Sequence, residues 1–181
     1  MKRVFVIVVA LGLLAISAQI AGAQSLPFLQ VFFDDLYTVG SMDCPGAMPD
    51  SAYVVAKNFN MYMQGIEYKV AYPAEMVWLA DNVGTALAIG NTSIGIAQAW
   101  PLPQNAYVPF SVAKVLFFWN CTGCPIKNIP IVVVPHPETF KLRALRWPDL
   151  LEVNIVGSTS LVCATIPVEE SSWGQIKALY K

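Results

Sequence analysis

The sequence predicts an all-β fold, and within that class a single β-sandwich of about nine strands. Hydrophobic residues make up 56% of the 181 residues and charged residues only 13%, which excludes intrinsic disorder and coiled coils. Short runs rich in β-branched and aromatic residues are separated by Gly, Pro, Asn or Asp about every 8 to 15 residues, the spacing expected of a sandwich. Helical periodicity is scarce, so the strands must pack on one another.

The N-terminal segment has the three parts of a secretory signal peptide. Lys2 and Arg3 form a basic start, residues 4–20 are predominantly apolar, and residues 21–23, Ala-Gly-Ala, form a small-residue cleavage site. We therefore predict that residues 1–23 are a signal peptide, that the mature protein begins at Gln24, and that it is secreted, in the periplasm or outside the cell.

The charge and hydropathy of the mature chain limit its partners. It keeps 9 of the 11 basic residues against 12 acidic ones, a net charge of −3, which does not attract a nucleic acid. No later apolar run reaches the ~18 residues that a membrane helix needs, so we expect no membrane contact after cleavage.

Residues 24–166 are predicted to form the β-sandwich domain. In residues 66–72, Glu67 and Lys69 alternate with apolar residues, which predicts one buried and one wet face. Residues 115–119 are apolar on both faces, as in a central strand, and Pro130 indicates an edge strand or an N–H position that faces solvent. The predicted strands are 28–33, 52–57, 65–72, 85–89, 94–100, 112–119, 129–134, 141–147 and 159–163.

Two segments have some helical character. Residues 73–81 are predicted to hold one short helical turn, because Pro73 suits a first helical position. Residues 167–181 are predicted to form a linker and a short helical tail, which Ser171 or Ser172 caps. Trp173, Ile176, Leu179 and Tyr180 share one face of that tail.

Four cysteines in an exported chain predict disulfides, and three connectivities are open. If the first and last strands lie side by side, as in a jelly-roll-type sandwich, Cys44 and Cys163 meet, and Cys121 pairs with Cys124 across a Thr-Gly turn. We favour this arrangement. A redox site or a zinc site at Cys121 and Cys124 is disfavoured, because Pro125 follows where a redox motif needs a helix and no second ligand pair is near.

The sequence predicts no enzyme and no cofactor. His136 is the only histidine, and its Pro-His-Pro context indicates a rigid surface turn rather than a catalytic arrangement. No pair of carboxylates has a spacing that marks a glycosidase site. Acidic loop residues suit calcium, but no D-x-D-x-D loop is present. These residues are Asp34, Asp35, Asp43 and Asp50.

A resemblance to a known family rests on four segments, residues 54–58, 64–73, 77–79 and 112–118. Their order and packing positions resemble cohesin-type, Ig-like β-sandwiches over about 65 residues. The chain departs from that pattern at Pro73, where Asp is usual, and at residues 109–111, where Gly is usual. The resemblance implies an Ig-like sandwich and does not carry over dockerin binding. Residues 172–180 also resemble tails of exported bacterial proteins with no assigned activity.

These observations favour an exported, non-catalytic β-sandwich that acts in recognition of a protein partner at the cell surface, or as a structural module of the envelope or extracellular space. Phe59, Tyr62 and Met63 form the predicted interaction patch, because an ordinary connection is more polar. The competing interpretation is that Phe59, Met61 and Met63 close one end of the core.

A second functional class stays open, an extracellular carbohydrate-binding or carbohydrate-processing protein. Sandwiches often present aromatic platforms to sugars, and three aromatic residues lie near predicted strand ends. They are Trp100, Tyr107 and Trp147.

Overall fold

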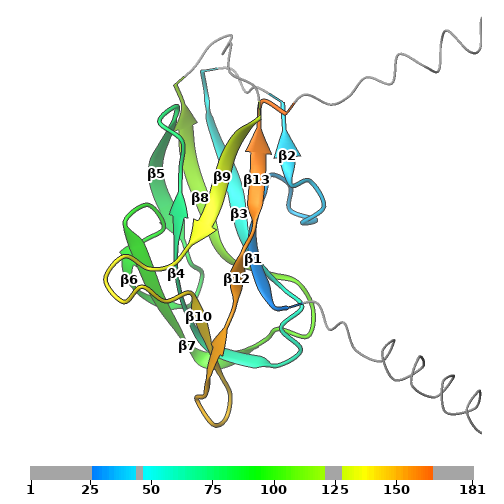
Figure 1. Cartoon of the computed structure of the whole chain (residues 1–181), viewed down its shortest axis with the longest axis vertical. Helices are drawn as coiled ribbons and strands as arrows, with labels where there is room; N and C mark the ends of the chain where they lie inside the picture. The colour runs from blue at the N-terminus through cyan, green and yellow to red at the C-terminus, as the bar shows by residue number, and fades with distance from the viewer. Residues whose placement is uncertain (1–25, 44–46, 121–127, 165–181) are drawn as a thin grey trace, which may run out of the picture.

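The computed structural model describes residues 26–43, 47–120 and 128–164. These residues form two β-sheets that face each other, with no helix (Figure 1). The predicted signal peptide, the helical tail, Cys44, Cys121 and Cys124 lie outside the described residues. The strands are β1 (Phe28–Phe32), β2 (Ser41–Met42), β3 (Pro49–Lys57), β4 (Tyr62–Ala71), β5 (Met76–Asn82), β6 (Leu87–Asn91), β7 (Gly95–Asn105), β8 (Phe110–Trp119), β9 (Ile129–Val134), β10 (Arg143–Arg146), β11 (Glu152–Asn154), β12 (Val156–Gly157) and β13 (Thr159–Val162).

The smaller sheet has the order β12-β1-β3-β8-β5. The larger sheet has the order β11-β10-β4-β9-β13-β2. In addition, β7 pairs with β4, and β6 pairs with β7. β4 therefore organises the larger sheet: β7 pairs with one side of it, while β10 pairs with Met63–Glu67 and β9 with Lys69–Ala71 on the other. Neighbouring strands are antiparallel except β1 with β12 and β2 with β13.

Each of the nine predicted strands overlaps an observed one, and the short turn predicted within residues 73–81 is present but is followed by a strand that was not predicted. Only Ala74 and Glu75 form a turn, which the Met76 N–H closes by donating to the Pro73 carbonyl at 3.0 Å. The chain then continues as β5, because β8 offers Met76–Asn82 a strand to pair with. Tertiary pairing has overridden a local helical signal. The other unpredicted strands, β2, β11 and β12, have only two or three residues.

The hydrophobic core fills the space between the two sheets. Its largest fully buried side chains include Trp119, Tyr68, Phe117, Leu29 and Met63. β8 lies between β3 and β5, as predicted for a central strand. Its two faces differ, however, because its outward residues alternate with the buried ones, and Leu116 is 44% exposed.

β9 is an interior strand, so of the two alternatives predicted from Pro130, an edge strand or an N–H position that faces solvent, the edge strand is wrong. β9 is hydrogen-bonded to both β4 and β13. Pro130 is nevertheless exposed and pairs only with Leu161, because β4 reaches no further along β9 than Val132. The missing N–H therefore removes no hydrogen bond to β4, which explains why a proline is tolerated there.

The hairpin of β6 and β7 packs closely on the turn around His136. Gly95 has a φ of 122°, and a Cβ there would lie 2.6 Å from Pro137 and 2.8 Å from His136. Gly90 has a φ of 80°, and a Cβ there would lie 2.1 Å from the Gly95 carbonyl oxygen. Only glycine fits both positions, and the two glycines set where β6 and β7 lie on the larger sheet.

Candidate functional site

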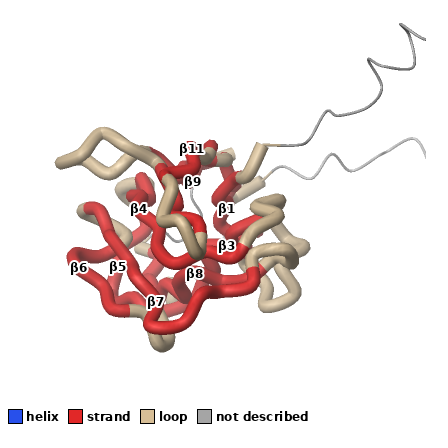
Figure 2. The backbone as a smooth tube through the Cα atoms, turned by 90° about the horizontal axis from the view of Figure 1, so that it is seen from below, coloured by secondary structure: helices blue, strands red, loops and turns tan. Residues whose placement is uncertain are grey.

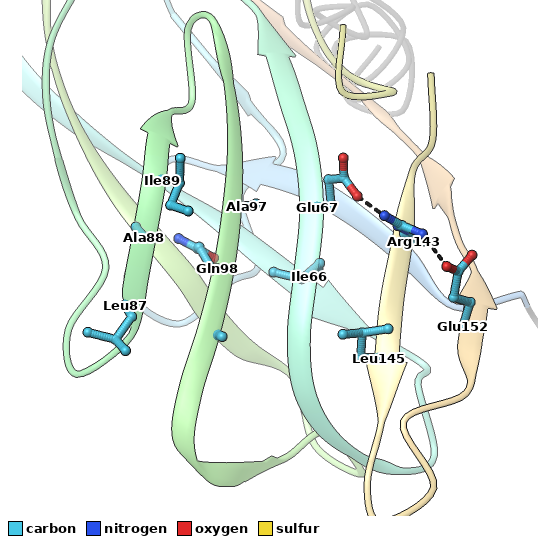
Figure 3. Close-up of a pocket in the computed structure, with 11 residues that line it drawn as sticks. Ile66, Glu67, Leu87, Ala88, Ile89, Ala97, Gln98, Arg143, Leu145 and Glu152 are labelled. Atoms are coloured by element: carbon cyan, nitrogen blue, oxygen red, sulfur yellow. Dashed lines mark hydrogen bonds and ion pairs between the residues drawn. The ribbon is translucent and has the colours of Figure 1, made fainter. Parts of the chain in front are cut away.

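A groove of about 570 Å³ crosses the outer face of the larger sheet (Figure 3). It is bounded by β6 on one side and by β10 and β11 on the other, and β7 and β4 form its floor. The strand register aligns its residues in two rows. The first row is Leu87, Ala99, Gly65 and Leu145, and the second is Ile89, Ala97, Glu67 and Arg143.

Small residues hollow the floor of the groove. Ala97 and Ala99 lie on β7, and at Gly65 a Cβ would already meet the Gln98 carbonyl oxygen at 3.0 Å. The wall on β6 is apolar and prominent, because Leu87 is 73% exposed and Ile89 is 82% exposed. The depth of the groove thus follows from side-chain size along two neighbouring strands.

A charged cluster centred on Glu67 forms the other part of the groove. Glu67 is only 8% exposed. The Arg143 Nε–H donates to its Oε2 at 2.7 Å, and the Thr139 hydroxyl donates to its Oε1. His136 Nδ1 lies 3.7 Å from the same Oε1. Arg143 also binds Glu152, as Figure 3 shows, and Lys141 Nζ donates to Glu152 Oε2 at 3.1 Å.

This cluster holds Glu67 ionised at neutral pH. Burial by itself would raise the pKa of Glu67, but the hydrogen bonds from Thr139 and Arg143, together with nearby positive charge, lower it below its ordinary value. The hydrogen bond to Glu67 in turn raises the pKa of Arg143. The two charges are fixed against each other, an arrangement suited to positioning and hydrogen bonding rather than to proton transfer.

Two sequence predictions about this cluster are wrong. Glu67 was expected on a wet face, yet Arg143 on β10 and Thr139 in the β9–β10 connection enclose its carboxylate. His136 was expected to be a surface residue, yet its side chain is 11% exposed and packs between Gly95 and Glu67. Both errors have one cause: the sequence does not show that β10 and its connection lie against β4.

A second polar cluster, which the sequence did not indicate, joins the two sheets. Asp81 accepts hydrogen bonds from the Thr92 N–H at 2.6 Å, the Thr92 hydroxyl at 2.8 Å and the Trp78 Nε1–H at 3.0 Å. The Tyr72 hydroxyl lies 2.6 Å from that of Thr92. Burial raises the pKa of Tyr72, which keeps its hydroxyl neutral. This cluster fastens β5 to the β6–β7 turn.

The predicted interaction patch is not formed as an exposed surface. Phe59 is 6% exposed and Met63 is fully buried, and only Tyr62, at 47%, reaches solvent. Asn58 and Asn60 adopt left-handed conformations, with φ of 62° and 48°, as the chain turns from β3 to β4. Phe59 joins the core there with Met61 and Met63, as the competing interpretation expected.

The predicted aromatic platform is also rearranged. Trp100 is 5% exposed and packs edge-on against Phe110 in the core. Tyr107 and Trp147 are 58% and 47% exposed. The Tyr62 and Tyr107 ring centroids are 5.5 Å apart, and the backbone N–H of Trp147 donates to the backbone carbonyl of Tyr62 at 2.9 Å. The exposed aromatic residues here are therefore the Tyr62–Tyr107 ring pair and Trp147, whose backbone is bonded to that of Tyr62.

Cys163 is the one cysteine among the described residues, and it is buried and not a free thiol. Its position bears on its pairing. β13 runs parallel to β2 with Val162 opposite Met42, and the Ala164 N–H donates to the Met42 carbonyl at 3.2 Å. Cys163 thus lies beside the chain that leads to Cys44. Because Cys44 lies outside the described residues, the pairing of the four cysteines stays a prediction.

The acidic loop residues form no metal site among the described residues. The carboxylate of Asp34 accepts hydrogen bonds from residues of its own loop, namely from the Thr38 N–H and hydroxyl and from the Val39 N–H. In residues 26–43, 47–120 and 128–164, no three His, Cys, Asp or Glu side chains are grouped to hold a metal ion. The same residues include no helix with the length and hydropathy to cross a bilayer.

Solved structures with a similar fold include cohesins. No family model and no curated protein matches the sequence. Among solved structures, a complex of CaCohA2 from Clostridium acetobutylicum with a variant of CaDoc0917 matches with a TM-score of 0.54 and 11% identity, covering 77% of this chain and 99% of that one. The Coh-OlpA–Doc918 complex from Clostridium thermocellum matches with 0.51 and 8% identity, covering 76% and 99%.

A non-cellulosomal cohesin from Archaeoglobus fulgidus matches with a TM-score of 0.50 and 10% identity, covering 83% of this chain and 98% of that one. Identities this low carry the fold alone. The chain is a single β-sandwich with a cohesin-like fold.

Proposed function

We propose that this chain is an exported, non-catalytic recognition module, and that its groove binds an amphipathic α-helix of a protein partner. The observation that carries the proposal is the apolar wall of β6 beside a floor of small residues. Leu87 and Ile89 are 73% and 82% exposed, side by side, above Ala97 and Ala99. A groove with exposed apolar walls on a folded domain is typical of an interaction site.

The width of the groove fits a helix. Its walls, β6 and β10, are separated by three strand spacings, about 14 Å in all, and an α-helix with its side chains is about 10–12 Å across. A helix lying along the strands would place an apolar stripe on the floor and contact both walls, Leu87 and Ile89 on one side and Leu145 on the other.

The charged cluster supplies polar contacts at low entropic cost. Arg143 is held by Glu67 and Glu152, so its guanidinium and the half-exposed Glu152 carboxylate are ordered before a partner arrives. These groups would fix the orientation of a helix that carries polar residues beside its apolar stripe.

The solved structures support a protein as the partner. CaCohA2 and Coh-OlpA are described in complexes with the dockerin partners CaDoc0917 and Doc918. In those proteins the cohesin fold serves protein recognition, and we propose the same class of function here, at the cell surface after removal of residues 1–23. Identity is too low to carry over the dockerin itself, so the partner is defined by the groove.

Site-specific photo-crosslinking tests the proposal. A benzophenone amino acid is placed at Ala99 in the groove or, as a matched control, at Leu116, which lies outward on the opposite sheet. Each protein is illuminated in the envelope fraction of its own host. We expect a protein adduct only from the Ala99 position, mapping by mass spectrometry to a helical segment, and an unlabelled Ala99→Glu competitor should fail to suppress it.

Equal adducts from both positions, or none from Ala99, would overturn the proposal. A normal circular dichroism spectrum and melting temperature for each variant would confirm that the sandwich is intact. An adduct that maps to an extended segment would retain the protein partner but reject the helix.

A second candidate, glycan binding, is favoured by the exposed Tyr62–Tyr107 ring pair and the exposed Trp147, which we call the aromatic cluster. Aromatic rings of this kind can stack on sugars, and the cluster lies apart from the residues of the groove. Binding on a glycan array that is lost in Tyr107→Ala and kept in Ala99→Glu would establish this function. Binding that survives Tyr107→Ala and Trp147→Ala would reject the site.

A further inference from the structure

β6 is an unprotected edge of the larger sheet. It pairs with β7 on one side, and no described strand pairs with its other side. Figure 2 shows it at the margin of the molecule. In an antiparallel strand alternate residues direct their N–H and C=O groups away from the neighbour, so β6 presents a row of backbone donors and acceptors outward. The natural partner of such a row is another extended strand.

Other edges in the described part of the chain carry features that hinder such pairing. β2, β11 and β12 are two or three residues long. β5 has a register shift between Trp78 and Ala80 and contains Asp81. Short length, irregular register and charge are the usual protections of an edge strand.

β6 has none of these protections. Its five residues pair with β7 without a register shift, it contains no proline, and no charged residue occurs anywhere between Asp81 and Lys114. Only Gly90, with a φ of 80°, departs from extended backbone geometry. Leu87 and Ile89, at 73% and 82% exposure, add apolar side chains to the open backbone. An exposed, regular and apolar edge is a site of association between chains.

We propose that a second copy of this chain pairs with β6 in antiparallel orientation, so that the two larger sheets join into one. An antiparallel edge is its own complement about a two-fold axis, and such self-complementary contacts give closed dimers. A register centred on Ile89 sets Leu87 of each copy opposite Asn91 of the other and places the two Ile89 side chains together. Because β6 has no charge, no like charges meet across the axis.

The dimer would be compatible with the proposed helix partner but does not depend on it. Pairing uses the backbone edge of β6, whereas a helix would lie on the face of the sheet. In a continuous sheet with a perpendicular two-fold axis, both grooves open on the same side. The dimer would thus present two grooves to a partner that carries two helices, which increases its avidity.

Sedimentation velocity of the full mature chain over a concentration series tests the pairing. The critical variant is Ile89→Lys, which places like charges on the axis, and the matched control is Ile94→Lys, in the turn beyond the strand, where Ile94 is 62% exposed. We expect wild type and Ile94→Lys to dimerise, and Ile89→Lys to weaken dimerisation at least about tenfold. Melting temperatures should stay unchanged, because both side chains are exposed.

Amide hydrogen exchange gives an independent measurement without substitution. Protection in residues 87–91 should increase with protein concentration, while protection in β5 should not. A wild-type protein that remains monomeric at millimolar concentration would overturn the proposal, as would a dimer that persists in Ile89→Lys. The groove variant Ala99→Glu should still dimerise, so failure of the helix-binding proposal and failure of the dimer are distinguishable.

Discussion

The inner and outer faces of the larger sheet are formed by the same strands but carry side chains of different size and burial. Along β4, Ile66, Tyr68 and Val70 point inward and are at most 3% exposed, whereas Gly65 and Glu67 point outward. The inner face carries large apolar side chains that the smaller sheet covers. The outer face carries small and charged residues on β4 and β7, and its most exposed large apolar side chains in the groove are Leu87 and Ile89 on β6, which no described residue covers.

Because of this difference, side chains on the two faces contribute unequally to folding. Inner apolar area is removed from water on folding and stabilises the sandwich. The apolar area of Leu87 and Ile89 contributes little to folding, because it stays in water in the folded chain. Substitutions on the inner face should therefore change the free energy of unfolding, and substitutions on the outer face should change the proposed partner binding. Substitution of Glu67, which is buried on the outer face, should change both.

The largest effect on the free energy of unfolding should come from the predicted disulfide between Cys44 and Cys163. We predict that Cys44 pairs with Cys163 and Cys121 with Cys124. Cys163→Ala should then lower the free energy of unfolding by about 4–5 kcal/mol, because a very long loop is released, and Cys124→Ala should cost far less. Urea unfolding measures both. A Cys44–Cys121 or Cys44–Cys124 peptide in non-reducing mapping would contradict the pairing.

Neighbouring residues at the start of β4 give the sharpest contrast between the faces. Met63 is fully buried and Tyr62 is 47% exposed. Met63→Ala should lower the free energy of unfolding by about 2–5 kcal/mol through the cavity it leaves, while Tyr62→Ala should cost about 1 kcal/mol or less. Thermal and urea unfolding test the pair. Similar losses for both variants would mean that Tyr62 contributes to the core.

The contribution of Glu67 to the free energy of unfolding should depend on pH. Glu67→Gln leaves Arg143 without its buried counter-charge and should lower the free energy of unfolding by about 2–3 kcal/mol at pH 7. Because folding lowers the pKa of Glu67, its contribution is fully present above the ordinary value of 4.5 and is lost as the pH falls through the lowered value.

Urea unfolding between pH 7 and pH 3 measures this dependence. The stability difference between wild type and Glu67→Gln should shrink on acidification. Glu152→Gln is the control, because Glu152 is half exposed and its ion pairs contribute little. A constant difference across the pH range would show that Glu67 acts by packing alone.

The smallest effect on folding should come from the outer wall. Leu87→Ala should change the free energy of unfolding by about 0.5 kcal/mol or less, because Leu87 is 73% exposed. Leu29→Ala, at a fully buried position, is the comparison and should cost several times more. If Leu87→Ala proved strongly destabilising, the wall would belong to the core and the recognition proposal would lose its basis.

The sequence by itself determined the fold class and the positions of most of the strands, β5 being the one strand longer than three residues that it missed. Alternating side chains and turn residues are local signals, so residues 28–33, 112–119 and 129–134 could be recognised as strands without knowing what they pair with. The low share of charged residues also predicted a compact chain, because this prediction needs only the composition.

Only the tertiary structure decided what each strand faces. β5 became a strand because β8 was available, Glu67 was enclosed because β10 lies beside β4, and Met63 was buried because the chain turns at Asn58 and Asn60. The groove arises from register, which brings Leu87, Ala99 and Gly65 into one row from separate segments. Such contacts between distant residues leave no periodic signal in the sequence, because each segment alone satisfies its own local pattern.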